Sequence, residues 1–172
     1  MIGRPRLRIR HLLFAVALAA APLALSAAPA SADGPHADLY CINTFVSDII
    51  PAVTPELQHN ESTSHGLTGT ADCTGNIDGY QVTGTGIFGQ QTQGSGDCNE
   101  GGGQTQAELR IPTTGGVKTV VANAIYHYDN RIGIAGLTGQ ETGPVDFIIV
   151  DGDCWNVPLS HNTSVFTGTV IT

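Results

Sequence analysis

Basic residues are scarce beyond the first ten positions of this chain. Only three occur there (Arg110, Lys118 and Arg131), whereas all 15 acidic residues lie in the same part, so residues 33–172 carry a formal net charge of −12. Polyanion binding needs clustered Lys and Arg that displace counterions. The composition therefore argues against nucleic acid and anionic membrane surfaces as partners. An acidic surface of this kind predicts a soluble monomer.

Aromatic residues are also few, at 6% of the chain. Carbohydrate-binding surfaces use aromatic rings that stack on sugars, and only Tyr126, Tyr128 and Trp155 could be assembled into such a ligand-binding set. Tyr126 and Tyr128 share one face of an expected strand, because alternate strand residues point the same way. The same face could instead continue the core, which is the interpretation we prefer.

The common catalytic and metal-binding signatures are missing. No Gly-x-Ser-x-Gly turn occurs, and no His lies two to four residues from another His or from Cys. The Asp151-Gly152-Asp153 turn lacks the further oxygen ligands of a calcium loop. The glycine clusters in 94–103 are not followed by the Lys of a phosphate loop. We therefore predict no cofactor and no metal.

One weak candidate for acid–base chemistry remains. His127 and Asp129 lie at the end of an apolar strand pattern and would share a face, so they could act as a general acid–base pair. The alternative is a surface histidine beside a turn.

The chain has a single long apolar run, and it lies near the N-terminus. Four arginines in positions 4–10 precede the apolar stretch Leu12–Leu25, and small residues follow at Ala30-Ser31-Ala32. This order predicts a secretory signal peptide over 1–32, with cleavage before Asp33. The run is short and contains Pro22, which argues against a membrane span. The mature protein would then be secreted and extracellular.

Only four cysteines are present: Cys41, Cys73, Cys98 and Cys154. All follow the signal, so two disulfides are expected in an oxidising compartment. If the strands alternate in direction, Cys73, Cys98 and Cys154 lie at the same end. We therefore favour Cys73–Cys98 and Cys41–Cys154 among the three possible pairings.

No stretch keeps a helical period for three turns. From Ser64 onward Thr, Val, Ile and Gly dominate between closely spaced turn signals, which predicts a single antiparallel meander of about eight strands in one domain, residues 33–172. We expect it to close as a β-barrel, with a β-sandwich as the alternative. Residues 33–60 contain Pro51 and Pro55, so we expect a strand near 39–45 and then an irregular segment that docks on the barrel. The expected later strands are 64–74, 79–89, 91–98, 104–112, 117–128, 131–139, 144–151 and 163–171.

A short pattern of a large apolar residue, Thr and Gly recurs four times: Leu67-Thr68-Gly69, Val82-Thr83-Gly84, Leu137-Thr138-Gly139 and Phe166-Thr167-Gly168. Strand alternation would place the threonines outside and the glycines inside. Inward glycines would either let a small barrel bend or leave room for a ligand.

The Arg- and Ala-rich leader, the repeated Thr-Gly steps and the corners Ala71-Asp72-Cys73 and Gly96-Asp97-Cys98 resemble small secreted β-rich proteins of actinobacteria whose function is uncharacterised. The resemblance implies export and a β fold, and assigns no catalytic residue.

We expect a non-catalytic extracellular protein that binds a small ligand or a cell-envelope partner. The ligand hypothesis requires an interior cavity, on the order of a few hundred Å³. One alternative is a small secreted hydrolase or isomerase that uses His127 and Asp129. Another is a secreted enzyme inhibitor with a disulfide-braced loop such as 96–104.

Overall fold

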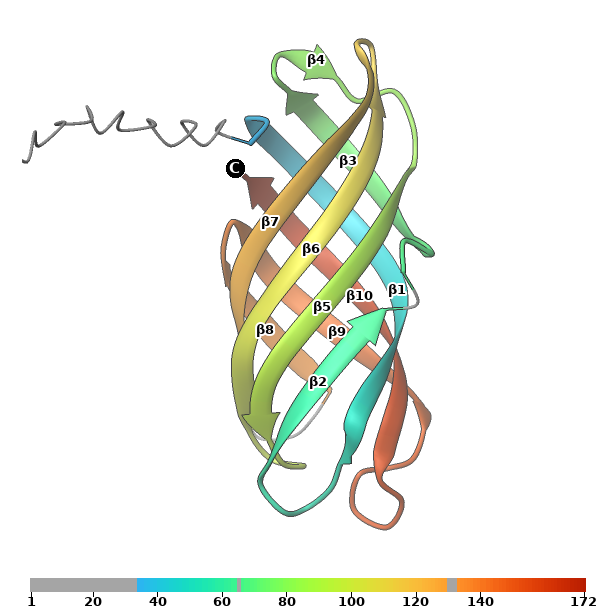
Figure 1. The fold of residues 1–172 in the computed structure, drawn as a ribbon, viewed down its shortest axis with the longest axis vertical. Coiled ribbons are helices and arrows are strands. Elements are labelled where there is room, and N and C mark those ends of the chain that lie inside the picture. The colour runs from blue at the N-terminus through green and yellow to red at the C-terminus, as the bar shows by residue number, and fades with distance from the viewer. Residues whose placement is uncertain (1–33, 65, 130–132) are drawn as a thin grey trace, which may run out of the picture. The chain divides into compact units, whose positions relative to one another are not determined.

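The computed structural model describes residues 34–64, 66–129 and 133–172, and in these ranges it contains strands and no helix. The predicted signal peptide, His65 and Arg131 therefore lie outside the described residues. No segment of the described ranges forms a helix that could cross a bilayer. The ten strands are shown in Figure 1. They are β1 (Ala37–Val53), β2 (Gln58–Ser64), β3 (Gly69–Ile77), β4 (Tyr80–Gln81), β5 (Gly86–Gly96), β6 (Gly101–Thr113), β7 (Gly116–Tyr128), β8 (Ile134–Gly139), β9 (Glu141–Asp151) and β10 (Leu159–Ile171).

The strands form one antiparallel meander that closes on itself. From β5 to β10 each strand pairs with the next, and β10 pairs with β1. β2 and β3 follow each other along one position of the ring, since each pairs with β1 on one side and β5 on the other. The short β4 pairs antiparallel with the last residues of β3 at the upper end of Figure 1. The ring has eight positions and is uneven about its axis. The predicted all-β meander barrel with two disulfides is confirmed.

The core follows from strand alternation. On β1, Leu39, Cys41 and Phe45 are buried inside the barrel, while the residues between them face solvent. The Thr-Gly repeats obey the rule only in part: Gly69 and Gly168 are buried, whereas Gly84 and Gly139 are exposed. A Cβ at Gly69 would crowd Phe45, and one at Gly168 would crowd Phe166. At both positions a backbone carbonyl (Thr44 or Thr142) is at least as close, so these two glycines allow close approach of neighbouring strands as well as of the phenylalanines.

The N-terminal segment is more regular than expected. β1 runs through to Val53, although the sequence predicts an irregular segment after Phe45. Pro51 follows a cis peptide bond and lies where the pairing with β10 skips from Asp48 to Val53. A proline is tolerated at such a bulge because no partner needs its missing N–H.

The predicted disulfide pairing is wrong. The bonds join Cys41 to Cys73 and Cys98 to Cys154. The error arose because 79–89 and 91–98 were predicted as two strands, whereas the end of the first range and most of the second form the single strand β5. The extra change of direction wrongly placed Cys73 at the same end of the barrel as Cys98. Cys73 instead lies opposite Cys41 across the β1–β3 ladder, with a Cα–Cα distance of 4.1 Å.

Candidate functional site

A cavity of about 70 Å³ lies inside the barrel, toward the end that carries the β1–β2 and β9–β10 connections. This end is the lower one in Figure 1. We call this space the lower cavity. Its apolar lining includes Phe45, Ile49, Val53, Ala135, Leu137, Val145 and Phe147. Its polar lining is Ser47, Asn60, Ser62, Gln90, Thr92, Tyr126, Tyr128, Asn162 and Ser164.

The lower cavity exists because inward-facing residues change character along the strands. Toward the upper end β10 points Val170 and Phe166 inward, and lower down it points Ser164 and Asn162 inward. β1 makes the same change from Leu39 to Ser47. Burying polar groups costs free energy unless they find partners. Polar residues at these inward positions therefore make the lower interior a candidate site.

Tyr126 and Tyr128 both face the inside of the barrel. Tyr128 is buried, and its hydroxyl donates to the Asp97 carbonyl at 2.7 Å. Burial raises the pKa of the Tyr126 phenol, and burial followed by the neighbouring Tyr126 and Asp97 raises the pKa of Tyr128. Both phenols therefore remain protonated hydrogen-bond donors at neutral pH.

The glycine-rich β5–β6 hairpin makes room for these rings. A Cβ at Gly94 would collide with the Tyr126 hydroxyl, one at Gly96 with the Tyr128 hydroxyl, and one at Gly101 with the Tyr128 ring. The glycine cluster thus has a packing cause that the sequence pattern did not reveal.

The polar groups around the lower cavity are partly joined to one another. Asn162 Nδ2 donates to Ser164 Oγ at 2.8 Å, and Asn60 Nδ2 donates to the Pro51 carbonyl at 2.8 Å. Gln90 Nε2 donates to Thr92 Oγ1 at 2.9 Å. The buried Asn162 Oδ1 accepts no hydrogen bond. The lining contributes no charged side chain from the described residues. The cavity therefore offers an unused acceptor in neutral surroundings.

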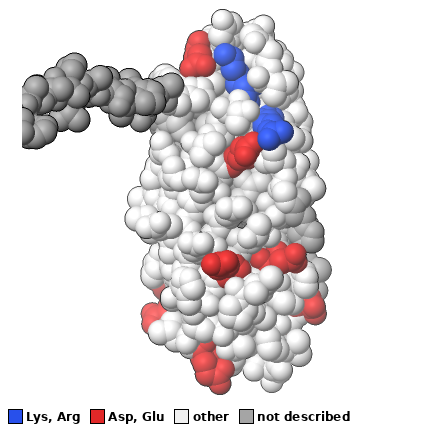
Figure 2. All heavy atoms as spheres, viewed as in Figure 1, with Lys and Arg blue, Asp and Glu red and all other residues white. Residues whose placement is uncertain are grey.

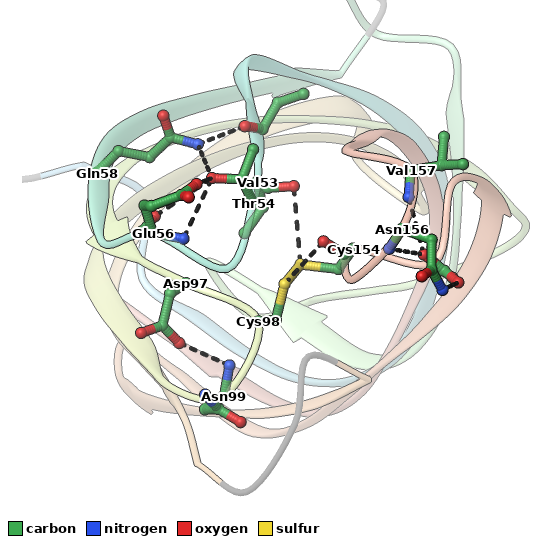
Figure 3. Close-up of a disulfide and its surroundings, with 12 residues drawn as sticks. Val53, Thr54, Glu56, Gln58, Asp97, Cys98, Asn99, Cys154, Asn156 and Val157 are labelled. Carbon is green, nitrogen blue, oxygen red and sulfur yellow. Dashed lines mark hydrogen bonds between the residues drawn. A yellow bond between two sulfur atoms is a disulfide. The ribbon is translucent and has the colours of Figure 1, made fainter.

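Three connections and a disulfide cover the lower end of the barrel. Figure 3 shows Cys98, from the β5–β6 turn, bonded to Cys154 of the β9–β10 connection, with Val53 beside them. Both cysteines are fully buried. The Cys154 sulfur lies 3.7 Å from the Val53 carbonyl oxygen, so the bond also contacts the end of β1.

Carboxylates order two of these connections. Asp97 Oδ1 accepts from the Asn99 and Glu100 N–H groups at 2.6 and 3.1 Å. Asp153 accepts from the Asn156 side chain and from the Asn156 and Val157 N–H groups, which lowers the pKa of Asp153 to about 2. The Asp151-Gly152-Asp153 segment is thus a hydrogen-bonded turn.

The residues that the sequence suggested for function do not meet. His127 and Asp129 are exposed on the outside of the barrel, and within the described ranges no hydrogen bond or ion pair joins them. Trp155 is 52% exposed in the β9–β10 connection, apart from the inward-facing tyrosines. Tyr126 and Tyr128 do belong to the candidate site, as lining of the lower cavity.

A hydrogen-bonded histidine that the sequence did not suggest lies on the outer wall. His161 Nε2 is 2.9 Å from Asp48 Oδ1, and His161 Nδ1 is 2.9 Å from Ser160 Oγ. The His161 side chain is 49% exposed and does not line the lower cavity. Asp48 lies opposite it on β1, in a segment for which the sequence predicted no strand.

Among the described residues, one carboxyl group is fully buried inside the barrel. Glu141, at the start of β9, is fully buried, and neither carboxyl oxygen has a hydrogen-bond partner. Burial raises the pKa of Glu141 to about 7. In the described part of the chain, no group of three or more His, Cys, Asp or Glu residues is placed to hold a metal ion.

The fold and the site define an eight-position antiparallel barrel with a disulfide-covered lower end and a small, uncharged cavity. Comparisons of the chain with protein-family models, with curated proteins and with solved structures found no match.

Proposed function

We propose that this protein is a secreted, non-catalytic binding protein that holds a small uncharged ligand in the lower cavity. The observation that carries the proposal is the buried, unpartnered Asn162 Oδ1 in the lining of that cavity. An acceptor of this kind favours a ligand with a hydroxyl or amide N–H, because a buried acceptor left unpaired costs about 1–3 kcal/mol.

The rest of the lining limits the ligand further. Phe45, Leu137 and Val145 supply apolar contacts. Without a compensating charge in the lining, an ionised ligand would lose its hydration and gain no partner. At about 70 Å³ the cavity does not reach the few hundred Å³ that the sequence-based hypothesis required, and it is far smaller than the roughly 300–1,000 Å³ of drug-sized pockets. The ligand is therefore a small alcohol or amide with a short apolar part.

Predicted export is consistent with this proposal, but it gives no information about the ligand-binding residues. The leader pattern of residues 1–32 predicts secretion. The two disulfides are consistent with an oxidising compartment.

The test is ligand-observed NMR with a panel of small alcohols and amides, together with carboxylic acids and amines of the same carbon skeletons. We expect the neutral compounds to bind and the ionised ones not to. Asn162→Leu should weaken binding about tenfold, since one lost hydrogen bond is worth about 1.4 kcal/mol.

Asn123→Leu is the matched control, because it makes the same change on the outer face of β7. Binding by no compound in the panel would overturn the proposal. Equal weakening by the two substitutions would also overturn it.

A further inference from the structure

The wall of the barrel is incomplete along the upper part of β7. β7 spans Gly116–Tyr128, yet β8 pairs only with residues 124–127. In Figure 1 the turn between β8 and β9 lies well below the upper end of β7. No described strand pairs with residues 116–123 on this side. The upper part of β7 is therefore an open sheet edge.

Backbone groups of β7 point into this opening. The Asn123 N–H donates to Gln140 Oε1 at 2.8 Å, and the Asn123 carbonyl accepts from the Gln140 N–H at 2.9 Å. The backbone groups of Asn123 thus face away from β6. Strand alternation turns those of Thr119 and Val121 the same way, above the β8–β9 turn. Both residues then offer an N–H and a carbonyl to an added strand.

A groove of about 710 Å³ runs beside this edge. Thr119, Val121 and Asn123 form one wall, and Gln140 also lines the groove. The opposite wall is residues 34–36 with Thr172, held by contacts of 2.7 Å between His36 Nδ1 and the Thr172 carbonyl oxygen and 2.6 Å between Thr172 Oγ1 and the Pro35 carbonyl. A strand added to β7 would lie in a bordered groove and not on an open surface.

The protection of this sheet edge is limited to one charged residue. Natural edges carry Pro, charged residues on either face or a bulge that blocks further pairing. The upper part of β7 has no proline, and Val117, Thr119 and Val121 are exposed β-branched residues. Lys118 lies over the Tyr80 ring at 4.7 Å and pairs with Asp78 at 3.5 Å. Its charge is therefore directed away from the edge.

We propose that this edge binds an extended, positively charged segment of another protein by β-strand addition. Main-chain hydrogen bonds to Thr119 and Val121 would provide the pairing. Small or β-branched residues at alternate positions would pack beside Val117 and Val121.

Charge selects this partner over a second copy of the chain. Within the described part, both cations are already paired, Arg110 with Glu108 at 2.9 Å and Lys118 with Asp78 at 3.5 Å. Figure 2 shows basic side chains only toward the upper end of the viewed face, with acidic ones beside them and also toward the lower end. Residues 33–172 carry a net charge of −12, so two copies repel each other and a basic segment is attracted.

The first test is amide hydrogen exchange of the secreted protein. We expect fast exchange at Thr119 and Val121 and slow exchange at Val120 and Ala122, whose backbone groups face β6. Slow exchange at all four amides would show that the edge is already covered and would overturn the proposal.

The second test selects phage-displayed random hexapeptides on the secreted protein. We expect Lys- or Arg-containing sequences with alternating β-branched residues, whose binding protects the Thr119 and Val121 amides. Thr119→Pro removes the edge N–H and should weaken binding at least tenfold. Thr119→Val keeps that N–H and should bind as the parent does.

A peptide N-methylated on the amides that face β7 provides a check that does not depend on folding of the proline variant. It keeps the charge and the side chains but cannot pair. The proposal is overturned if the N-methylated peptide binds as tightly as the parent, if no peptide or mainly acidic peptides are selected, or if the protein self-associates through this edge.

Discussion

Glu141 should make the protein less stable as the pH rises from acid to neutral. Its carboxyl is fully buried, and burial raises its pKa from 4.5 to about 7. The folded state therefore binds the proton more tightly than the unfolded state does. Below pH 4.5 Glu141 is protonated in both states and adds no penalty. Above pH 7 the folded protein must bury a carboxylate, and the whole penalty applies.

The magnitude follows from the size of the pKa shift. A difference of one pKa unit corresponds to about 1.36 kcal/mol. The shift from 4.5 to about 7 thus predicts a loss of about 3 kcal/mol in the free energy of unfolding between pH 4.5 and pH 8. Asp153, with a pKa of about 2, affects stability only at more acidic pH.

Urea unfolding followed by far-ultraviolet circular dichroism at pH 5, 6, 7 and 8 measures this loss. Glu141→Gln keeps the shape of the side chain and removes the ionisation, so its unfolding free energy should change little over the same range. The reasoning is refuted if the parent protein is equally or more stable at pH 8. It is also refuted if Glu141→Gln shows the same decline as the parent.

Three further predictions concern packing. Gly96→Ala should destabilise the protein by about 1–3 kcal/mol through its clash with the Tyr128 hydroxyl, and Tyr128→Phe should relieve part of that cost. The control Gly136→Ala should have a small effect, because a Cβ there meets no neighbouring atom. Additive effects of Gly96→Ala and Tyr128→Phe in a double-mutant cycle would contradict the clash. Replacing Cys98 and Cys154 by Ser should lower the free energy of unfolding by about 4 kcal/mol, because the unfolded chain regains the entropy of the closed loop. Amide exchange should become faster chiefly in residues 96–101 and 152–158, and a uniform change would argue against a local role of the bond. Asn162→Leu should raise the thermal midpoint while weakening ligand binding about tenfold, because it replaces an amide whose buried Oδ1 has no partner by an apolar group. A lower midpoint would mean that the cavity is already well satisfied.

The sequence predicts the strands that have a simple alternating pattern. β7 is expected at 117–128 and observed at Gly116–Tyr128, because inward Val120, Ala122 and Ala124 alternate with exposed residues. β1 was shortened because Pro51 was taken as a break, whereas the structure accommodates this proline at a bulge. A proline in a strand pattern signals either outcome, and only the register with β10 distinguishes them.

The error in β5 has a different cause. The predicted strands 79–89 and 91–98 were separated at Gln90, whereas in the structure both Gln90 and Thr92 are polar residues that face inward on the one strand β5. Both residues line the lower cavity. The pattern therefore failed where the site required polar residues facing inward, as sequence rules tend to fail at functional sites. The wrong disulfide pairing followed from this one error, since it reversed the direction expected for every later strand.

The two halves of the barrel are stabilised in different ways. Toward the upper end, Leu39, Ile111, Val120 and Val170 fill most of the interior with aliphatic side chains, although the buried Glu141 lies opposite Val170 there. Toward the lower end, Ser47, Asn162 and Ser164 occupy the equivalent inward positions, and each forgoes the roughly 1.5–3 kcal/mol that a buried aliphatic side chain contributes.

The Cys98–Cys154 bond lies at the end with the weaker interior, where it joins two connections that no strand pairing holds together. A closed loop of this length contributes about 4 kcal/mol, which is comparable to the burial forgone at two such positions. The covalent bond therefore allows the lower interior to remain polar and partly empty without loss of the fold. This arrangement supports the proposal that the lower cavity binds a ligand, because a barrel interior that serves only as a core does not require it.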